Sequence, residues 1–127
     1  MTGVTTYDGE TFIADLLFGN ATGTIDTIAI GTGTTTAQRS DTALENEVYR
    51  ADTSNANVTV EATSERGEYT MAVQVAGGTE VDPGTVITEV GLFVSANAVM
   101  VGRETFAGLQ IDSGESARIA PPFDVFP

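Results

Sequence analysis

The feature that most constrains the fold is a stretch of alternating apolar and polar residues near the middle of the chain. Val58, Val60 and Ala62 alternate with polar residues, and the same period returns further on in Tyr69, Met71, Val73 and Val75. Successive side chains of a β-strand point to opposite faces, so each run is typical of a strand with one buried face. The residues between the runs, Ser64 to Gly67, favour a turn. We therefore predict an antiparallel hairpin.

Further strands are expected on both sides of this hairpin. Residues 25–31 predict a strand with Ile28 and Ile30 on one face. Residues 85–94 predict a longer strand, and residues 98–106 predict its antiparallel return after a short turn. In the longer strand the pattern places four side chains on one face: Val86, Thr88, Val90 and Leu92.

The last segment, residues 116–126, has apolar residues that a core could take, but it contains Pro121 and Pro122. Proline has no N–H to donate to a neighbouring strand, so this strand is expected to be bent, bulged or at a sheet edge. Edge strands are where β-proteins recruit neighbours, which makes the segment a candidate contact surface. A plain strand break is the alternative interpretation.

Two short helices are expected in the N-terminal half. In residues 9–18 apolar side chains recur at helical spacing, and Gly19 follows at a position where helices commonly end. This helix would either cover one end of a sheet or dock onto a neighbouring subunit. A second helix is predicted to begin near Thr42, because Thr42 and Glu45 have the spacing of a capping box.

The length of the chain limits how these elements combine. At 127 residues it corresponds to one domain, residues 1–127, which is long enough to bury its own core. The elements together predict a mainly β fold: one antiparallel β-sandwich of about six or seven strands, with two short helices in the N-terminal half.

Residues 31–36 form a Gly-Thr tract. Its glycines suggest a phosphate-binding loop, but the residues required for such a loop are missing. A P-loop needs a lysine for the outer phosphates, and this chain has none. The GxGxxG pattern fails as well, because Thr36 stands where the third glycine belongs. We instead predict a turn in which Gly31 and Gly33 adopt backbone angles that threonine reaches poorly and the threonine hydroxyls fix the bend.

The residue types restrict the chemistry available to the chain. It contains no cysteine, histidine or lysine, which excludes Ser-His pairs, thiolate or imidazole zinc sites and Schiff bases. We therefore expect no enzymatic activity and no cofactor. Asp41 and Glu45 are weak candidates for a cation site, because on a helix they would share a face. A solvated helix face is the alternative.

The charge balance restricts the partners. Eighteen acidic residues against five arginines give a net charge of −13, and no basic cluster exists that would bind nucleic acid. The acids are spread along the chain, which favours adaptation to high salt, where charges are screened within about 3 Å, over a cation site or a cationic partner. The apolar residues 12–18 are interrupted by Asp15, so we expect a soluble protein without a signal peptide or membrane span.

Several runs in order carry a resemblance to a known family: IAIGTGT at Ile28 to Thr34, SDTAL at Ser40 to Leu44 followed by Glu47-Val48 and Arg50, ITEVGLF at Ile87 to Phe93, then Gly102-Arg103 and Phe106. The chain resembles small structural proteins of tailed viruses, described as tail-fibre, tail-tip or other virion proteins. This resemblance implies a structural component that assembles as a symmetric homo-oligomer with other virion proteins, in the tail, baseplate or fibre region.

Two departures and two alternatives accompany the resemblance. The family usually closes with an alternating strand where this chain has Pro121 and Pro122, and Glu45 replaces a glycine. The acidic, lysine-free composition is similar to that of haloarchaeal proteins, so a haloarchaeal tailed virus is implied, with assembly into the virion in the host cytoplasm. The alternatives are a decoration or spike protein on the capsid, and a receptor- or carbohydrate-binding module, which the absence of tryptophan disfavours.

The matching runs also single out Glu89 and Gly91. A glycine inside a strand pattern indicates close approach of another group to the backbone. Glu89 is expected to meet Arg50 or Arg103 across neighbouring strands, while isolated exposed charges are the alternative. The expected structural or assembly positions are therefore Gly31, Gly33, Glu89, Gly91, Pro121 and Pro122.

Overall fold

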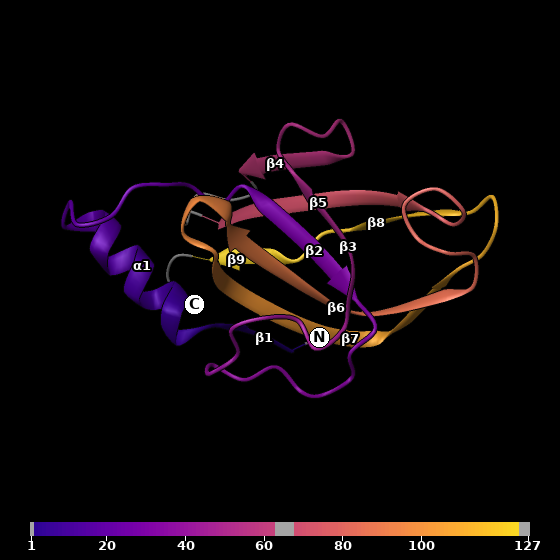
Figure 1. The fold of residues 1–127 in the computed structure, drawn as a ribbon, viewed down its shortest axis with the longest axis horizontal. Coiled ribbons are helices and arrows are strands. Elements are labelled where there is room, and N and C mark those ends of the chain that lie inside the picture. The colour runs from indigo at the N-terminus through magenta and orange to yellow at the C-terminus, as the bar shows by residue number, and fades with distance from the viewer. Residues whose placement is uncertain (1, 63–67, 125–127) are drawn as a thin grey trace.

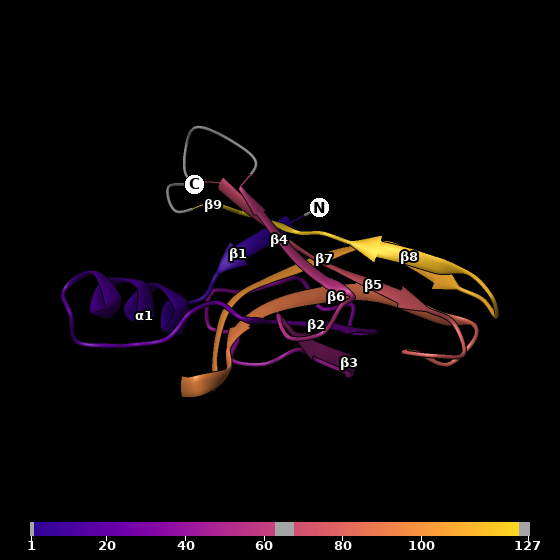
Figure 2. The same ribbon diagram turned by 90° about the horizontal axis from the view of Figure 1, so that it is seen from above.

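The computed structural model describes residues 2–62 and 68–124, which form two antiparallel β-sheets and one α-helix (Figure 1). Seen from above, the strands lie in two layers and the helix projects at one end (Figure 2). A mainly β fold with antiparallel sheets is thereby confirmed. The number of elements differs from the prediction, because the described residues contain nine strands and a single α-helix.

The first sheet has five strands, each antiparallel to its neighbours. Its order across the sheet is β1 (Thr2–Thr5), β7 (Val99–Ile111), β6 (Thr85–Val94), β2 (Thr27–Gly31) and β3 (Glu47–Asp52). The predicted strand at 25–31 and the pair at 85–94 and 98–106 are confirmed as β2, β6 and β7. A short 3-10 turn, Ser95–Asn97, connects the last two.

The second sheet contains the predicted hairpin. Its strands are β4 (Val58–Ala62), β5 (Glu68–Ala76), β8 (Ser116–Ile119) and β9 (Pro122–Asp124), with β5 pairing to all the others. Val58 pairs with Val73 and Val60 with Met71, so the apolar positions of the two runs lie opposite one another and the predicted hairpin pairing is confirmed. The turn predicted at 64–67 lies outside the described residues.

The C-terminal segment is divided at Pro121, as the two prolines predicted. β8 ends at Ile119 and β9 begins at Pro122, and both pair with β5 on the side away from β4. The segment therefore forms the edge of the second sheet in two short pieces. An assembly role for this edge stays a prediction.

The main core lies between the sheets. Side chains of both sheets form one apolar cluster, to which the first sheet contributes Ile28, Ile30, Ala51, Ile87, Val90, Leu92 and Ile111 and the second contributes Val58, Met71, Val73, Val75 and Ile119. β2 is buried at all five positions, because its other face is covered as well. There a smaller cluster forms from Ala29, Leu44, Phe93 and Met100.

One face prediction in β6 is wrong. The register shifts between Ile87 and Glu89, so the alternation is interrupted there. Ile87, Val90 and Leu92 lie in the main core, whereas Val86 is exposed. The irregularity therefore places Val86 outside the core face that the uninterrupted pattern assigned to it.

Helix α1 (Tyr7–Leu17) confirms the first predicted helix and begins two residues earlier than expected. The hydroxyl of Thr6 caps it by accepting a hydrogen bond from the N–H of Gly9 at 2.9 Å. Phe18 is the C-cap, and Gly19 follows with a φ of 76°, the left-handed conformation that commonly ends helices. α1 contacts β7, so it lies against one end of the first sheet.

The second predicted helix is absent, since residues 32–46 form a loop without helical structure. The expected pairing of Thr42 with Glu45 does not form. The carboxylate of Glu45 instead accepts hydrogen bonds from the backbone N–H groups of Thr34 and Thr35 at 2.8 and 3.2 Å. Leu44 packs against the first sheet, so burial and polar contacts with distant residues replaced the local helix.

Candidate functional site

The strongest polar cluster of the described structure holds the loop of residues 32–46 on the outer face of the first sheet. Its centre is Glu89 on β6, which is completely buried, beside Arg103 on β7, which is 4% exposed. The predicted contact of Glu89 with Arg103 is confirmed, with Arg103 Nε donating to Glu89 Oε1 at 3.0 Å. The other predicted partner, Arg50, pairs with Glu47 and stacks on the Phe93 ring.

Each oxygen of Glu89 accepts two hydrogen bonds. Oε1 accepts from the backbone N–H of Glu45 at 2.9 Å and from Arg103. Oε2 accepts from the backbone N–H groups of Gly33 at 2.9 Å and Asn46 at 2.8 Å. One carboxylate therefore joins both ends of the loop to the sheet.

Arg103 extends the cluster toward the middle of the loop. Its Nη1 donates to Asp41 Oδ2 at 2.9 Å, and its Nη2 donates to the carbonyl oxygen of Thr35 at 2.9 Å. The side chain of Asp41 also accepts from the backbone N–H of Gln38 at 2.8 Å. The guanidinium thus uses all three nitrogens on three different partners.

These contacts favour the ionised form of Glu89. Burial by itself raises the pKa of this carboxyl, but the backbone donors of Asn46, Glu45 and Gly33 and the Arg103 guanidinium outweigh it and hold the pKa below its usual range. The stabilisation is present above the ordinary value of 4.5 and is lost as pH falls through the lower folded pKa. Glu89 is therefore a charged anchor at neutral pH.

Gly31 and Gly33 serve close packing, which corrects the reason predicted for them. Neither has a positive φ. A Cβ on Gly31 would lie 2.5 Å from Glu89 Oε2, and one on Gly33 would lie 2.6 Å from the same oxygen. Side chains at these positions would displace the carboxylate, so the glycines leave the space that Glu89 occupies.

The other predicted positions are more widely separated. Gly91 lies under the loop, where a Cβ would approach Leu44 to 3.0 Å, so its predicted close approach is seen. Pro121 and Pro122 lie at the edge of the second sheet, and the structure does not bring them to Glu89.

Asp41 and Glu45 do not come together as cation ligands. Asp41 is paired with Arg103, and Glu45 accepts hydrogen bonds from Thr34 and Thr35. The Thr35 hydroxyl and these N–H groups keep the pKa of Glu45 below its usual range. Across residues 2–62 and 68–124 no three acidic side chains gather in a way that could hold a metal ion.

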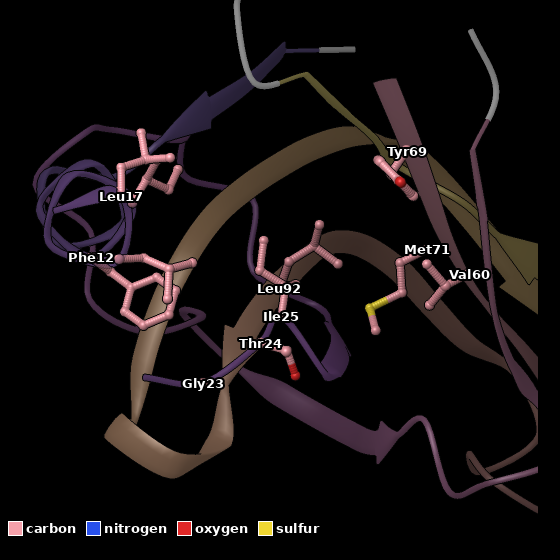
Figure 3. A pocket seen from close by; sticks show the side chains of 11 residues that line it. Phe12, Leu17, Gly23, Thr24, Ile25, Val60, Tyr69, Met71 and Leu92 are labelled. Atoms are coloured by element: carbon pink, nitrogen blue, oxygen red, sulfur yellow. The ribbon is translucent and has the colours of Figure 1, made fainter. Parts of the chain in front are cut away.

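A pocket of about 610 Å³, which was not predicted, opens between α1 and the second sheet (Figure 3). Phe12 and Leu17 of α1 lie on one side, and Val60, Tyr69 and Met71 of β4 and β5 lie opposite. The remaining lining comes from Ile13, Leu16, Gly23, Thr24, Ile25 and Leu92. The described residues that line this pocket include no carboxylate and no guanidinium.

Four of the residues that line the pocket are exposed apolar side chains, and Phe18, the exposed C-cap of α1, follows one of them in the chain. These five residues are here called the apolar end: Leu16, Leu17, Phe18, Val60 and Tyr69. Leu17 is 77% and Phe18 is 83% exposed. Contiguous apolar exposure of this kind marks interaction surfaces more often than ordinary surface. The sequence did contain a signal for this surface. A helix that lies on a sheet buries only one side, so the three consecutive apolar residues Leu16, Leu17 and Phe18 cannot all be buried.

Glu104 on β7 is a buried acid that sequence reasoning also missed. It pairs across the sheet with Val90, a core residue, so both side chains point between the sheets. Its Oε2 has no hydrogen-bond partner among the described residues, and burial raises the pKa of the carboxyl. The charged form of Glu104 therefore opposes folding.

We expect Glu104→Gln to raise the free energy of unfolding at pH 7 by about 1 kcal/mol, because it removes an unpaired buried charge. The gain should shrink as pH falls toward 4.5, where the wild-type carboxyl protonates in both states. Urea unfolding of both proteins between pH 4.5 and pH 8 measures this. A variant that is less stable than wild type across this range would contradict the unpaired-charge interpretation.

No helix among the described residues has the length and apolar content needed to cross a membrane. Comparisons with protein-family models, curated proteins and solved structures found no match for this chain.

Proposed function

We propose that the chain is a non-enzymatic structural subunit of a tailed-virus virion, which assembles as a symmetric homo-oligomer in the tail, baseplate or fibre region. The observation that supports assembly into an oligomer is the exposed apolar end. Leu17 and Phe18 expose most of their surface on a chain whose net charge is −13. Covering them with protein removes this surface from water, which favours association.

The positions that carry the family resemblance support a structural role. The run at 28–34 continues from β2 into the loop, and the run at 87–93 lies in β6 directly beside it. Glu89 from the second of these runs binds Gly33 from the first, and Arg103 joins them. The matching residues therefore meet in one packed unit, whose polar groups hold the loop in place.

The carboxylates of the polar cluster around Glu89 are already engaged. Glu89 accepts four hydrogen bonds and Asp41 is bound to Arg103. A catalytic acid or base needs access to substrate and a pKa near the working pH, whereas Glu89 is buried with a lowered pKa.

The fold class can also be proposed in finer detail. The two sheets share one apolar core, which supports the proposal that the fold is a β-sandwich.

The acidic composition supports function in concentrated salt. At −13 the molecules repel one another in dilute buffer, and molar salt reduces the range of that repulsion to about 3 Å. Association through the apolar end therefore becomes favourable where salt is high. A requirement for high salt supports the proposal that the tailed virus infects a haloarchaeon.

The test is the native mass of the purified protein by light scattering in molar salt and in dilute buffer. We expect a closed oligomer in molar salt, and loss of compactness and β-sheet circular dichroism after dialysis to low salt. A strictly monomeric species at every protein concentration in molar salt would contradict the assembly proposal. Unchanged structure in dilute buffer would contradict the adaptation to salt.

A further inference from the structure

We propose that the occupant of the pocket is Phe18 of a second copy of this chain, inserted reciprocally so that two copies join through their apolar ends. This inference rests on the proposed homo-oligomer and specifies its contact. Leu17 lines the pocket and Phe18 follows it directly as the C-cap of α1, so the exposed phenyl ring lies at the same end of the molecule as the pocket. A surface carrying both a projection and a recess can pair with itself about a two-fold axis.

Charge selects a second copy as the occupant. A cationic partner would be attracted to carboxylates, and the described part of the chain contributes none to the lining of this pocket. A second copy is strongly acidic, so it can approach closely only where carboxylates do not face one another. The apolar end meets that condition, because its five side chains carry no acidic or basic group other than the Tyr69 phenol.

The available area also fits a pair of copies. Side chains as large and as exposed as Leu17 and Phe18 allow each copy to bury on the order of 500 Å² at this end. Two copies then reach about 1,000 Å², the lower limit for a specific protein interface. Docking of the two ends together uses the whole surface, whereas a small ligand in the pocket would leave Phe18 in water.

The absence of cysteine permits a direct test by disulfide formation between copies. We would mix a Phe18→Cys variant with a Thr24→Cys variant in molar salt under mild oxidation. Thr24 is exposed and lines the pocket, so inserted residue 18 would bring the two sulfur atoms within reach. One native Phe18 contact remains in the mixed pair, because the Thr24→Cys copy keeps its phenyl ring.

The matched control replaces Phe18→Cys by Val48→Cys, an exposed position on the edge strand β3. We expect the mixed disulfide of residues 18 and 24 to form about tenfold faster than the control pair, since docking raises the effective concentration of the thiols. Equal rates in an oligomeric protein would overturn the reciprocal insertion and leave the proposed homo-oligomer standing. A wild-type monomer would overturn both.

Phe18→Ser gives an independent measurement that does not require oxidation. The side chain is 83% exposed, so its loss should leave the melting temperature of the subunit unchanged while raising the dissociation constant of the pair at least about tenfold. Val48→Ser should change neither quantity. Wild-type copies that form rings larger than two and lose them on Phe18→Ser would contradict the two-fold arrangement.

Discussion

Replacing Glu89 with glutamine should lower the free energy of unfolding by about 3–5 kcal/mol, the usual cost of removing one partner of a buried ion pair. For a chain of this length that loss corresponds to a fall in melting temperature of about 10–20 °C. The effect is large because Arg103, 4% exposed, would lose its buried ionic partner and keep only the less buried carboxylate of Asp41. The loop of residues 32–46 would lose its main anchor at the same time.

Glutamine fails at this position although it matches the shape of glutamate. Each oxygen of Glu89 accepts two N–H donors, one pair from Glu45 and Arg103 and the other from Gly33 and Asn46. The side-chain amide must place its own NH₂ donor against one of these pairs in either orientation. Two donors, at least one of them buried, would then lose their acceptor, which adds to the lost charge.

Glu104→Gln is the matched control, because it makes the same change on the neighbouring strand with the side chain on the opposite face of the same sheet. Urea unfolding in molar salt should rank Glu104→Gln above wild type and Glu89→Gln far below it. Hydrogen exchange of the Gly33 and Asn46 amides should also accelerate in Glu89→Gln. A loss below 1 kcal/mol with these amides still protected would show that the loop has other anchors.

The strands could be predicted because their alternation is local. The alternating runs that begin at Val58 and Tyr69 pair as the predicted antiparallel strands, with Val58, Met71, Val73 and Val75 buried. Gly19 and the prolines at 121 and 122 also mark element ends through their own backbone chemistry. Each of these signals is complete within a few residues of sequence.

The loop could not be predicted because its partners are distant in sequence. Thr42 and Glu45 fit a capping box, yet Glu45 binds Thr34 and Thr35 and its N–H is taken by Glu89, 44 residues away. The ion pair with Arg103 was predictable only as one of two options, since the order of the strands in the sheet decides which arginine lies beside Glu89. The choice depended on β7 lying next to β6 while Arg50 lies on β3, two strands away.

The position of α1 depends on a contact that local sequence does not show. Gly9 faces β7, where a Cβ would lie 2.7 Å from the Cα and 2.9 Å from the carbonyl carbon of Val101 and closer still to its oxygen. Thr6 fixes the same junction, with its hydroxyl donating to the Met100 carbonyl at 2.5 Å. Helix backbone and strand backbone therefore touch at Gly9, and this contact sets the wall of the pocket.

Replacing Gly9 with alanine should therefore lower the free energy of unfolding by about 2–3 kcal/mol, because rigid backbone atoms have to move. Helix propensity alone predicts the reverse, a gain of about 1 kcal/mol, so the sign of the change separates the two effects. Gly102→Ala is the control, since its Cβ would meet only the Val4 carbonyl at 3.2 Å on the neighbouring strand β1 and should cost little. Thermal unfolding measures both variants, and a Gly9→Ala protein more stable than wild type would mean that α1 does not rest on β7 through Gly9.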